Sequence, residues 1–104
     1  MVSLTLIGCS AGSDGALSVK EAVDRQPAEV VRVHGAVVIQ YGKPMICAEL
    51  TESSPPQCAA GLWLRGSPRQ LEDQEFHRDQ GVQWTESATV RGTVDGDGFF
   101  TLAP

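Results

Sequence analysis

Residues 30–40 read VVRVHGAVVIQ. Apolar and polar side chains alternate along this segment with a period of two, which predicts a long strand with one buried face. The apolar positions are Val31, Val33, Val37 and Ile39, and the polar positions are Arg32, His34 and Gln40. Gly35 lies at the middle of the apolar face. A glycine there predicts a bulge or a sharp coil, as a small barrel needs.

Four more strands are expected after this one. A turn at residues 41–44 leads into a strand at residues 45–50, and further strands follow at residues 59–66, 88–94 and 99–102. A tight turn at residues 95–98 joins the last two. Trp84 is expected in the core, just before the fourth strand.

Two helices complete the predicted fold. Residues 17–26 predict a short N-terminal helix, because Ser18 and Glu21 have the spacing of a capping box. Ser67 and Pro68 suit the start of a second helix, which is expected to run to residue 79 and to stop at Gly81. The length of 104 residues allows one domain. The fold class predicted is therefore mainly β: a small five-stranded OB-like barrel with a short N-terminal helix and a helix between strands three and four.

The N-terminus carries a distinct motif. Leu6-Ile7-Gly8-Cys9 resembles the lipobox of bacterial lipoproteins, and the polar, flexible residues 10–15 follow it. The resemblance implies that residues 1–8 are the remnant of a signal peptide and that residues 9–16 are a lipidated Cys9 with its tether. The OB-like domain would span residues 17–104, exported and anchored to the outer face of the cell membrane. A frayed N-terminal strand with an incidental cysteine is the alternative.

Export leaves Cys47 and Cys58 as an even pair. The loop between them contains two adjacent prolines, and a disulfide that closes a loop of this length stabilises a domain by about 3 kcal/mol in the chain-entropy model. A zinc site that combines both cysteines with His34 and His77 is one alternative. Two buried free thiols are another.

Charge bears on the possible partners. The chain has 13 acidic and 8 basic side chains and a net charge of -5, which is a poor match for nucleic acid. Asp95 and Asp97 begin like a calcium loop, but the glutamate that would close such a loop is missing. No metal, no cofactor and no catalytic residue is expected. His34 and His77 are expected on the surface without a serine or cysteine nucleophile beside either.

Trp63 and Arg65 should project from the outer face of the third strand. Together with His34, they are the candidate binding surface. The alternative for Trp63 is packing under the proline loop or under the N-terminal helix.

Beyond the lipobox, several short segments resemble uncharacterised exported lipoproteins of high-GC Gram-positive bacteria that carry an OB-fold-like domain. The segments are Val33-His34-Gly35, Cys47, Glu52-Ser53-Ser54-Pro55-Pro56-Gln57-Cys58, Gly81-Val82-Gln83-Trp84 and Arg91-Gly92-Thr93-Val94. The resemblance implies compartment, disulfide and fold, and no activity.

The function expected is a membrane-anchored extracytoplasmic binding or assembly module without enzymatic activity. Its partners would be the membrane, through the lipid anchor, and an envelope protein or small ligand. An OB-fold nucleic-acid-binding domain and an enzyme with an unrecognised site are the alternatives.

Overall fold

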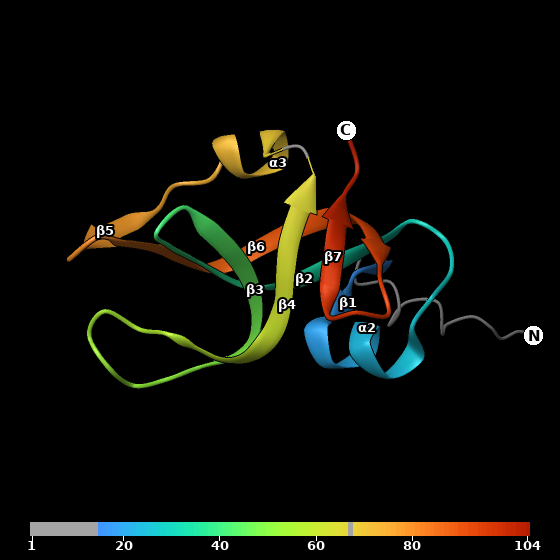
Figure 1. Ribbon diagram of the computed structural model, residues 1–104, viewed down its shortest axis with the longest axis horizontal. Coiled ribbons are helices and arrows are strands. Elements are labelled where there is room, and N and C mark those ends of the chain that lie inside the picture. The colour runs from blue at the N-terminus through green and yellow to red at the C-terminus, as the bar shows by residue number, and fades with distance from the viewer. Residues whose placement is uncertain (1–14, 67) are drawn as a thin grey trace, which may run out of the picture.

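The computed structural model of the chain describes residues 15–66 and 68–104 (Figure 1). Its elements are β1 (Leu17–Ser18), α2 (Val19–Arg25), β2 (Val31–Gln40), β3 (Lys43–Leu50), β4 (Cys58–Gly66), α3 (Arg69–Glu72), β5 (His77–Asp79), β6 (Val82–Val94) and β7 (Phe99–Leu102). The predicted signal-peptide remnant, Cys9 and most of the expected tether lie outside the described residues.

Five of the strands close into a barrel. The order in the sheet is β1-β2-β3-β4-β7-β6-β5, and an additional pairing of β2 with β6 closes the ring. Within the ring, β4 and β7 are parallel and the other pairs are antiparallel. The short α2 lies at one end of the barrel, and α3 follows β4 (Figure 1). The predicted five-stranded barrel with its N-terminal helix and its helix between strands three and four is confirmed.

A bulge lies beside Gly35, but on the partner strand β6 rather than on β2, where it was expected. The pairing of β2 with β6 shifts between Gly35, opposite Ala88, and Val37, opposite Thr85. Two residues of β2 therefore span three of β6, so the additional residue belongs to β6. A Cβ at Gly35 would lie 2.9 Å from Val19 Cγ2, too close for any side chain. The glycine thus lets α2 pack directly on the coiled part of β2.

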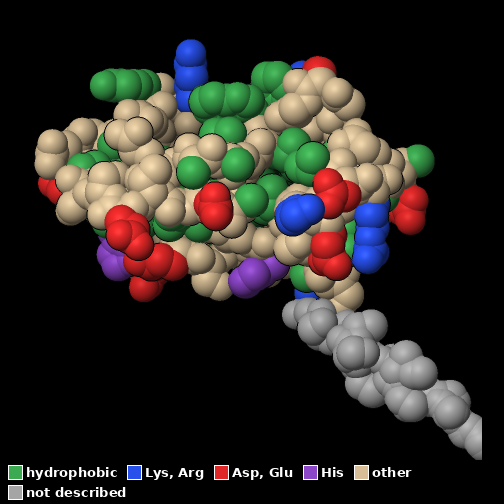
Figure 2. All heavy atoms as spheres, turned by 90° about the horizontal axis from the view of Figure 1, so that it is seen from below, with side chains coloured by type: hydrophobic (Ala, Val, Ile, Leu, Met, Phe, Trp, Pro, Cys, Tyr) green, Lys and Arg blue, Asp and Glu red, His purple; other side chains and the backbone are tan. Residues whose placement is uncertain are grey.

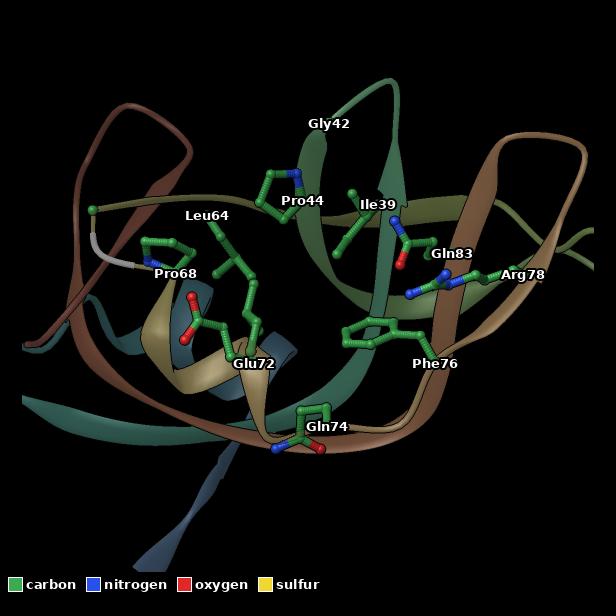
Figure 3. A pocket seen from close by; sticks show the side chains of 12 residues that line it. Ile39, Gly42, Pro44, Leu64, Pro68, Glu72, Gln74, Phe76, Arg78 and Gln83 are labelled. Atoms are coloured by element: carbon green, nitrogen blue, oxygen red, sulfur yellow. The ribbon is translucent and has the colours of Figure 1, made fainter.

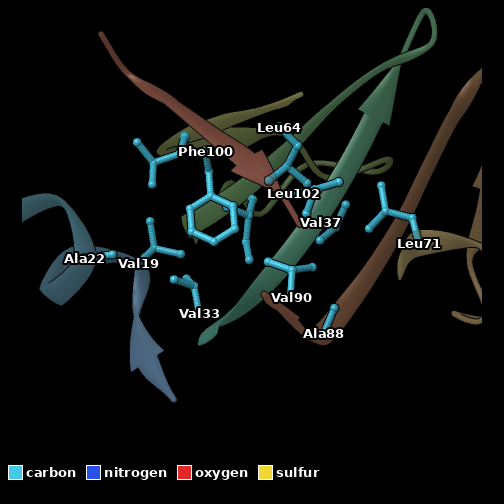
Figure 4. Packing of buried hydrophobic residues seen from close by; sticks show 12 residues of the cluster. Val19, Ala22, Val33, Val37, Leu64, Leu71, Ala88, Val90, Phe100 and Leu102 are labelled. Carbon is cyan, nitrogen blue, oxygen red and sulfur yellow. The ribbon is translucent and has the colours of Figure 1, made fainter. Parts of the chain in front are cut away.

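The interior of the barrel is filled by one apolar cluster (Figure 4). Phe100 of β7 is fully buried, toward the end of the cluster where Val19 of α2 lies, whereas Leu71 of α3 lies toward the other end (Figure 4). The buried members are Val19, Ala22, Val33, Val37, Ile46, Leu62, Leu64, Leu71, Ala88, Val90, Phe100 and Leu102. Burial of this apolar surface is the main stabilising contribution of the fold.

A second, smaller cluster lies on the outside of the same wall. It consists of buried Ala36, Val38, Cys47 and Val82, with Leu50, Cys58 and Trp84 packed against them. Cys47 and Cys58 form a disulfide with a Cα–Cα distance of 5.4 Å. The predicted disulfide is therefore present. β2 was expected to bury one face, but both of its faces are buried in its second half, where Ala36, Val37 and Val38 are all buried.

The N-terminal helix is shorter than predicted but has the expected start. Residues 17 and 18 form β1, and α2 begins at Val19. Ser18 Oγ accepts a hydrogen bond from the Glu21 amide, and the Glu21 carboxylate accepts one from the Ser18 amide, each at 3.0 Å. This reciprocal pair is the capping box, and it satisfies two amides that the helix itself leaves without a partner.

The predicted long helix after β4 is wrong. Only Arg69–Glu72 is helical, with Leu71 buried, and Ser67 lies outside the described residues. His77–Asp79 instead forms β5, which pairs with the start of β6. Gly81 belongs to the hairpin turn between them, where it and Gln80 have φ of 81° and 53°. The fourth barrel strand therefore starts at Val82 rather than at residue 88.

Candidate functional site

A row of register partners crosses the outer surface of the barrel, one from each of six strands. In order across the sheet, the row is His77, Trp84, Val38, Met45, Trp63 and Phe99. Residues that are direct partners across strands point to the same face of a sheet. The register therefore places four aromatic rings, the His77 imidazole among them, and two other apolar side chains in a single line, which we call the outer row.

The two tryptophans of the outer row differ in their surroundings. Trp84 was expected in the core, but it is half-buried on the outside of β6, against the small outer cluster. Trp63 remains 43% exposed. It lies neither under α2 nor fully under the proline loop, so packing accounts for only part of its surface.

A depression of about 240 Å³ opens beside Trp63. Val38 and Met45 of the outer row contribute to its lining, as does Cys58 of the disulfide. Its other lining side chains are polar: Gln40, Lys43 and Gln57. The depression therefore combines an aromatic wall with side-chain amides and an ammonium group. These are the ingredients of a site that binds an uncharged polar molecule.

One end of the outer row is held in place by charge. The Arg65 guanidinium lies 4.3 Å from the centre of the Phe99 ring and donates to the carboxylates of Asp95 and Asp97, at 3.0 and 3.2 Å. The Thr101 hydroxyl donates to Asp95 at 2.6 Å. This hydroxyl, and then Arg65, lowers the pKa of Asp95. Both aspartates of the predicted turn are thus engaged with Arg65 and fix the corner of the sheet.

Tyr41 stands at the tip of the hairpin that carries Lys43 and Met45. Tyr41 and Gly42 have φ of 55° and 75°, so both central residues of the two-residue turn are left-handed, as in a type I′ turn. Glycine, asparagine and aspartate suit such a position, whereas a bulky side chain there is strained. Tyr41 is also 86% exposed. No packing interaction explains this aromatic side chain.

His34 does not belong to the same surface. It lies on β2 opposite Ser18 of β1 and Thr89 of β6. A cleft of about 400 Å³ beside it is lined by residues of α2 and β3 and by Glu86. The structure therefore brings Trp63 and Arg65 together on β4 and leaves His34 in a separate cleft.

The expectation that no serine lies beside a histidine is wrong for His34. Its Nε2 is 3.3 Å from Ser87 Oγ, and its Nδ1 is 3.1 Å from Thr89 Oγ1. The first distance exceeds the range of about 2.6–3.2 Å that is typical of a nucleophile and its base. Sequence patterns missed the contact because Ser87 sits 53 residues away, in the bulged part of β6.

His77 has a different environment. Its ring centre lies 5.3 Å from that of Trp84, and its Nε2 is 3.2 Å from a Glu86 carboxylate oxygen. It therefore extends the outer row at its far end rather than facing a pocket with a nucleophile.

Among the further cavities formed by the described residues, two lie beside the helices. One, of about 480 Å³, opens between α3, the β2–β3 hairpin and β5 (Figure 3). Leu64 and Leu71 in its wall are members of the interior cluster, so this cavity is the incompletely covered end of the barrel. The other, of about 560 Å³, is a shallow groove between α2 and the β3–β4 pair, lined partly by Val23 and Ala60.

Figure 2 views the side of the molecule on which α2 lies. Apolar side chains are visible across the middle of this face, with acidic and basic side chains close together near one end. The side chains of α2 include two ion pairs, Lys20 with Asp24 and Arg25 with Glu21. This face therefore offers a mixed surface without a dominant charge.

The two alternatives for Cys47 and Cys58, a zinc site and a pair of free thiols, are both wrong. A disulfide sulfur is not the thiolate that zinc requires, so Cys47 and Cys58 are neither zinc ligands nor free thiols. Across residues 15–66 and 68–104, no group of three or more histidine, cysteine, aspartate or glutamate side chains is arranged to hold a metal ion.

Comparison with protein-family models finds no match, and comparisons with curated proteins and with solved structures give none either.

Proposed function

We propose that this protein is a non-enzymatic binding module, exported and held on the outer face of the cell membrane through a lipid on Cys9. The outer row around Trp63 would be its binding surface. The observation that carries the binding role is the exposed Trp63 beside a depression with polar lining, next to a corner where Arg65 pairs with Asp95 and Asp97. Preorganised surfaces of this kind bind with little loss of side-chain freedom.

Two observations support the location. The Leu6-Ile7-Gly8-Cys9 motif resembles a lipobox. The Cys47–Cys58 disulfide is of the kind that persists in oxidising compartments outside the cytosol. Among the helices that the structure describes, none has the length and apolar character needed to cross a membrane.

The place of the outer row within the barrel supports the binding role by analogy. OB-fold proteins bind ligands across the face of strands two and three and the loops that flank it. In this barrel, the second and third strands are β3 and β4, which carry Met45 and Trp63. This argument rests on the fold and not on a shared ligand.

Nucleic acid is the less favoured ligand. The net charge of -5 repels a polyanion, and Arg65, which lies beside the outer row, is already paired with two aspartates. Binding of single-stranded nucleic acid needs a positively charged groove as well as aromatic side chains on which bases stack, and the aromatic side chains of the outer row meet only the second need.

The anchor is tested by fractionating cells of the native host that express the full chain or its Cys9→Ser variant. The unaltered chain should partition with the membrane and carry a diacylglycerol on its N-terminal cysteine by mass spectrometry. The variant should lose both properties. An unaltered chain that keeps residues 1–8 and stays with the cytosol would overturn the location.

The binding surface is tested by adding detergent-solubilised envelope extract to the isotope-labelled full chain and recording amide and indole NMR signals. Signals of the outer row should broaden or shift, and Trp63→Ala should abolish the change. If the row is unaffected, or if only signals of the groove beside α2 respond, the outer row is not the binding surface.

A further inference from the structure

We infer that the ligand of the outer row is a saccharide, with one pyranose ring stacked on Trp63 and its hydroxyls bonded to Gln40, Gln57 and Lys43. The inference rests on the proposed binding function and names its ligand class. Three features of the site carry it: its size, its chemistry and its position in the sheet.

Size limits what can enter the depression. Pockets for drug-sized ligands are commonly about 300–1,000 Å³. The depression beside Trp63, at about 240 Å³, is smaller and takes a single ring rather than a folded peptide or a whole cofactor. A longer ligand would therefore place one unit in the depression and extend along the surface on either side.

The chemistry of the walls matches a sugar ring. One face of a pyranose presents C–H groups, which pack on an aromatic face, and its edge presents hydroxyls. Trp63 supplies the aromatic surface, and Val38 and Met45 extend the apolar floor. Gln40 and Gln57 carry amides that both donate and accept hydrogen bonds, and so match hydroxyls, which do the same. Lys43 adds a donor.

Position in the sheet argues against a peptide that adds a strand. Peptides bound by strand addition need a free sheet edge. Trp63 lies in the middle of the wall, because its strand is paired with β3 on one side and with β7 on the other. A helix would need a wide apolar groove, whereas polar Lys43 and Arg65 lie directly beside the row. An extended proline-rich peptide is the macromolecular ligand that the test must separate from a sugar.

Tyr41 supplies a second aromatic surface near the site. It projects from the hairpin tip two residues before Lys43 and is held there at a strained φ of 55°. Strained, exposed residues concentrate at binding sites, because selection for stability alone would replace them. A ligand of several sugar units that starts at Trp63 and runs toward the hairpin would reach Tyr41.

The test uses the full chain labelled with ¹⁵N, whose two tryptophans give two indole signals. The probes are tetrasaccharides of β-1,4-linked glucose, α-1,4-linked glucose and β-1,4-linked N-acetylglucosamine. A proline octapeptide and a thymidine oligonucleotide are added separately. We expect at least one saccharide to shift the Trp63 indole saturably at millimolar concentration, with little change at the Trp84 indole.

Variants connect the signal to the site. Trp63→Ala should weaken saccharide binding at least about tenfold, which is about 1.4 kcal/mol, and Trp63→Phe should retain part of it. Tyr41→Ala should weaken binding of the tetrasaccharide more than that of the corresponding monosaccharide. Val23→Ala is the control, because Val23 is exposed on the groove beside α2, outside the outer row, and its loss should leave affinity unchanged.

The failure of this inference is distinguishable from failure of the proposed function. If the peptide or the oligonucleotide shifts the Trp63 indole and no saccharide does, the saccharide is wrong and the binding surface stands. If no probe binds but envelope extract still perturbs the outer row, the saccharide is again wrong. If envelope extract also leaves the row unperturbed, both fail.

Discussion

The two sides of the barrel wall are built differently. Inside, Val33 and Val37 of β2 join the cluster that the closed sheet encircles. Outside, Ala36 and Val38 of the same strand lie in a cluster of four buried residues, covered by a disulfide and one tryptophan. The inner cluster is closed by topology, whereas the outer one is closed by a covalent bond and by side chains that remain partly exposed.

This difference assigns stability and candidate function to different surfaces of the barrel wall. Apolar surface that the barrel encloses stabilises the fold and is unavailable to partners. Apolar surface on the outside is covered near the disulfide and becomes accessible at Trp63, two strands away from Val38 in the same row. Within the outer row, Val38 is therefore a packing residue, whereas Trp63 belongs to the candidate binding surface.

The largest expected effect is the loss of a central interior side chain. Phe100→Ala should destabilise the domain by about 3–5 kcal/mol, because a fully buried ring leaves a cavity that the strands cannot close. The measurement is the denaturant midpoint followed by tryptophan fluorescence. Phe99→Ala, its half-buried neighbour on the outer face, is the matched control and should cost much less. Equal losses would contradict the division between inner and outer sides.

Removing the disulfide should have the next largest effect. The double variant Cys47→Ala with Cys58→Ser should lower the free energy of unfolding by about 2–4 kcal/mol, since the bond restricts the unfolded chain and covers the outer cluster. Thermal unfolding followed by circular dichroism measures the change. Cys9→Ser is the control and should leave the unfolding midpoint unchanged. An equally stable double variant would show that the outer cluster needs no covalent closure.

Much of this fold follows from local sequence. The alternation in residues 30–40 predicts β2, and Gly35 marks the bulge that a small closed barrel requires. Ser18 and Glu21 predict the start of α2, since a capping box depends only on residues three apart. The pairing of Cys47 with Cys58 was predicted from the short loop between them and from the assignment of Cys9, the third cysteine, to a lipid anchor.

The segment after β4 shows where local sequence is insufficient. Its polar composition favours a helix, but its two apolar side chains, Leu71 and Phe76, are five positions apart and cannot share one helical face. Pairing with β6 instead makes residues 77–79 a strand. The pairing requires β6 to begin at Val82, six residues earlier than predicted. Trp84 therefore lies within β6 rather than before it, and its position was predicted wrongly.

The candidate site was predicted only in part. The outward direction of Trp63 and Arg65 follows from alternation along β4, so both could be named from sequence. The outer row could not, because it depends on the register of five strand pairs, two of which contain register shifts. The contact of His34 with Ser87 escaped prediction for the same reason.

A smaller effect compares the two tryptophans of the outer row. Trp84→Ala should cost about 2 kcal/mol, because Trp84 covers the outer cluster, and Trp63→Ala should cost about 1 kcal/mol, because Trp63 is more exposed. Chemical denaturation followed by circular dichroism measures both. If Trp63→Ala proves the more costly of the two, Trp63 is mainly a packing residue and its proposed binding role loses its basis.

The smallest expected effect concerns the charged corner beside Phe99. The pKa of Asp95 is lowered from 3.8, chiefly by the hydrogen bond from Thr101 and then by Arg65. Its carboxylate therefore stabilises the folded state fully above the unfolded pKa of 3.8, and this contribution is lost as the pH falls through the lower folded pKa. Because the corner lies at the surface, we expect a contribution below about 1 kcal/mol.

Asp95→Asn should be less stable than the unaltered chain at pH 6, and the difference should shrink toward pH 2. Denaturant unfolding at several pH values measures this convergence. Asp97→Asn is the control: it removes one contact with Arg65 and keeps the bond between Asp95 and Thr101, so its acid dependence should follow that of the unaltered chain. A constant difference between Asp95→Asn and the unaltered chain at every pH would show that the Asp95 carboxylate contributes through its shape rather than its charge.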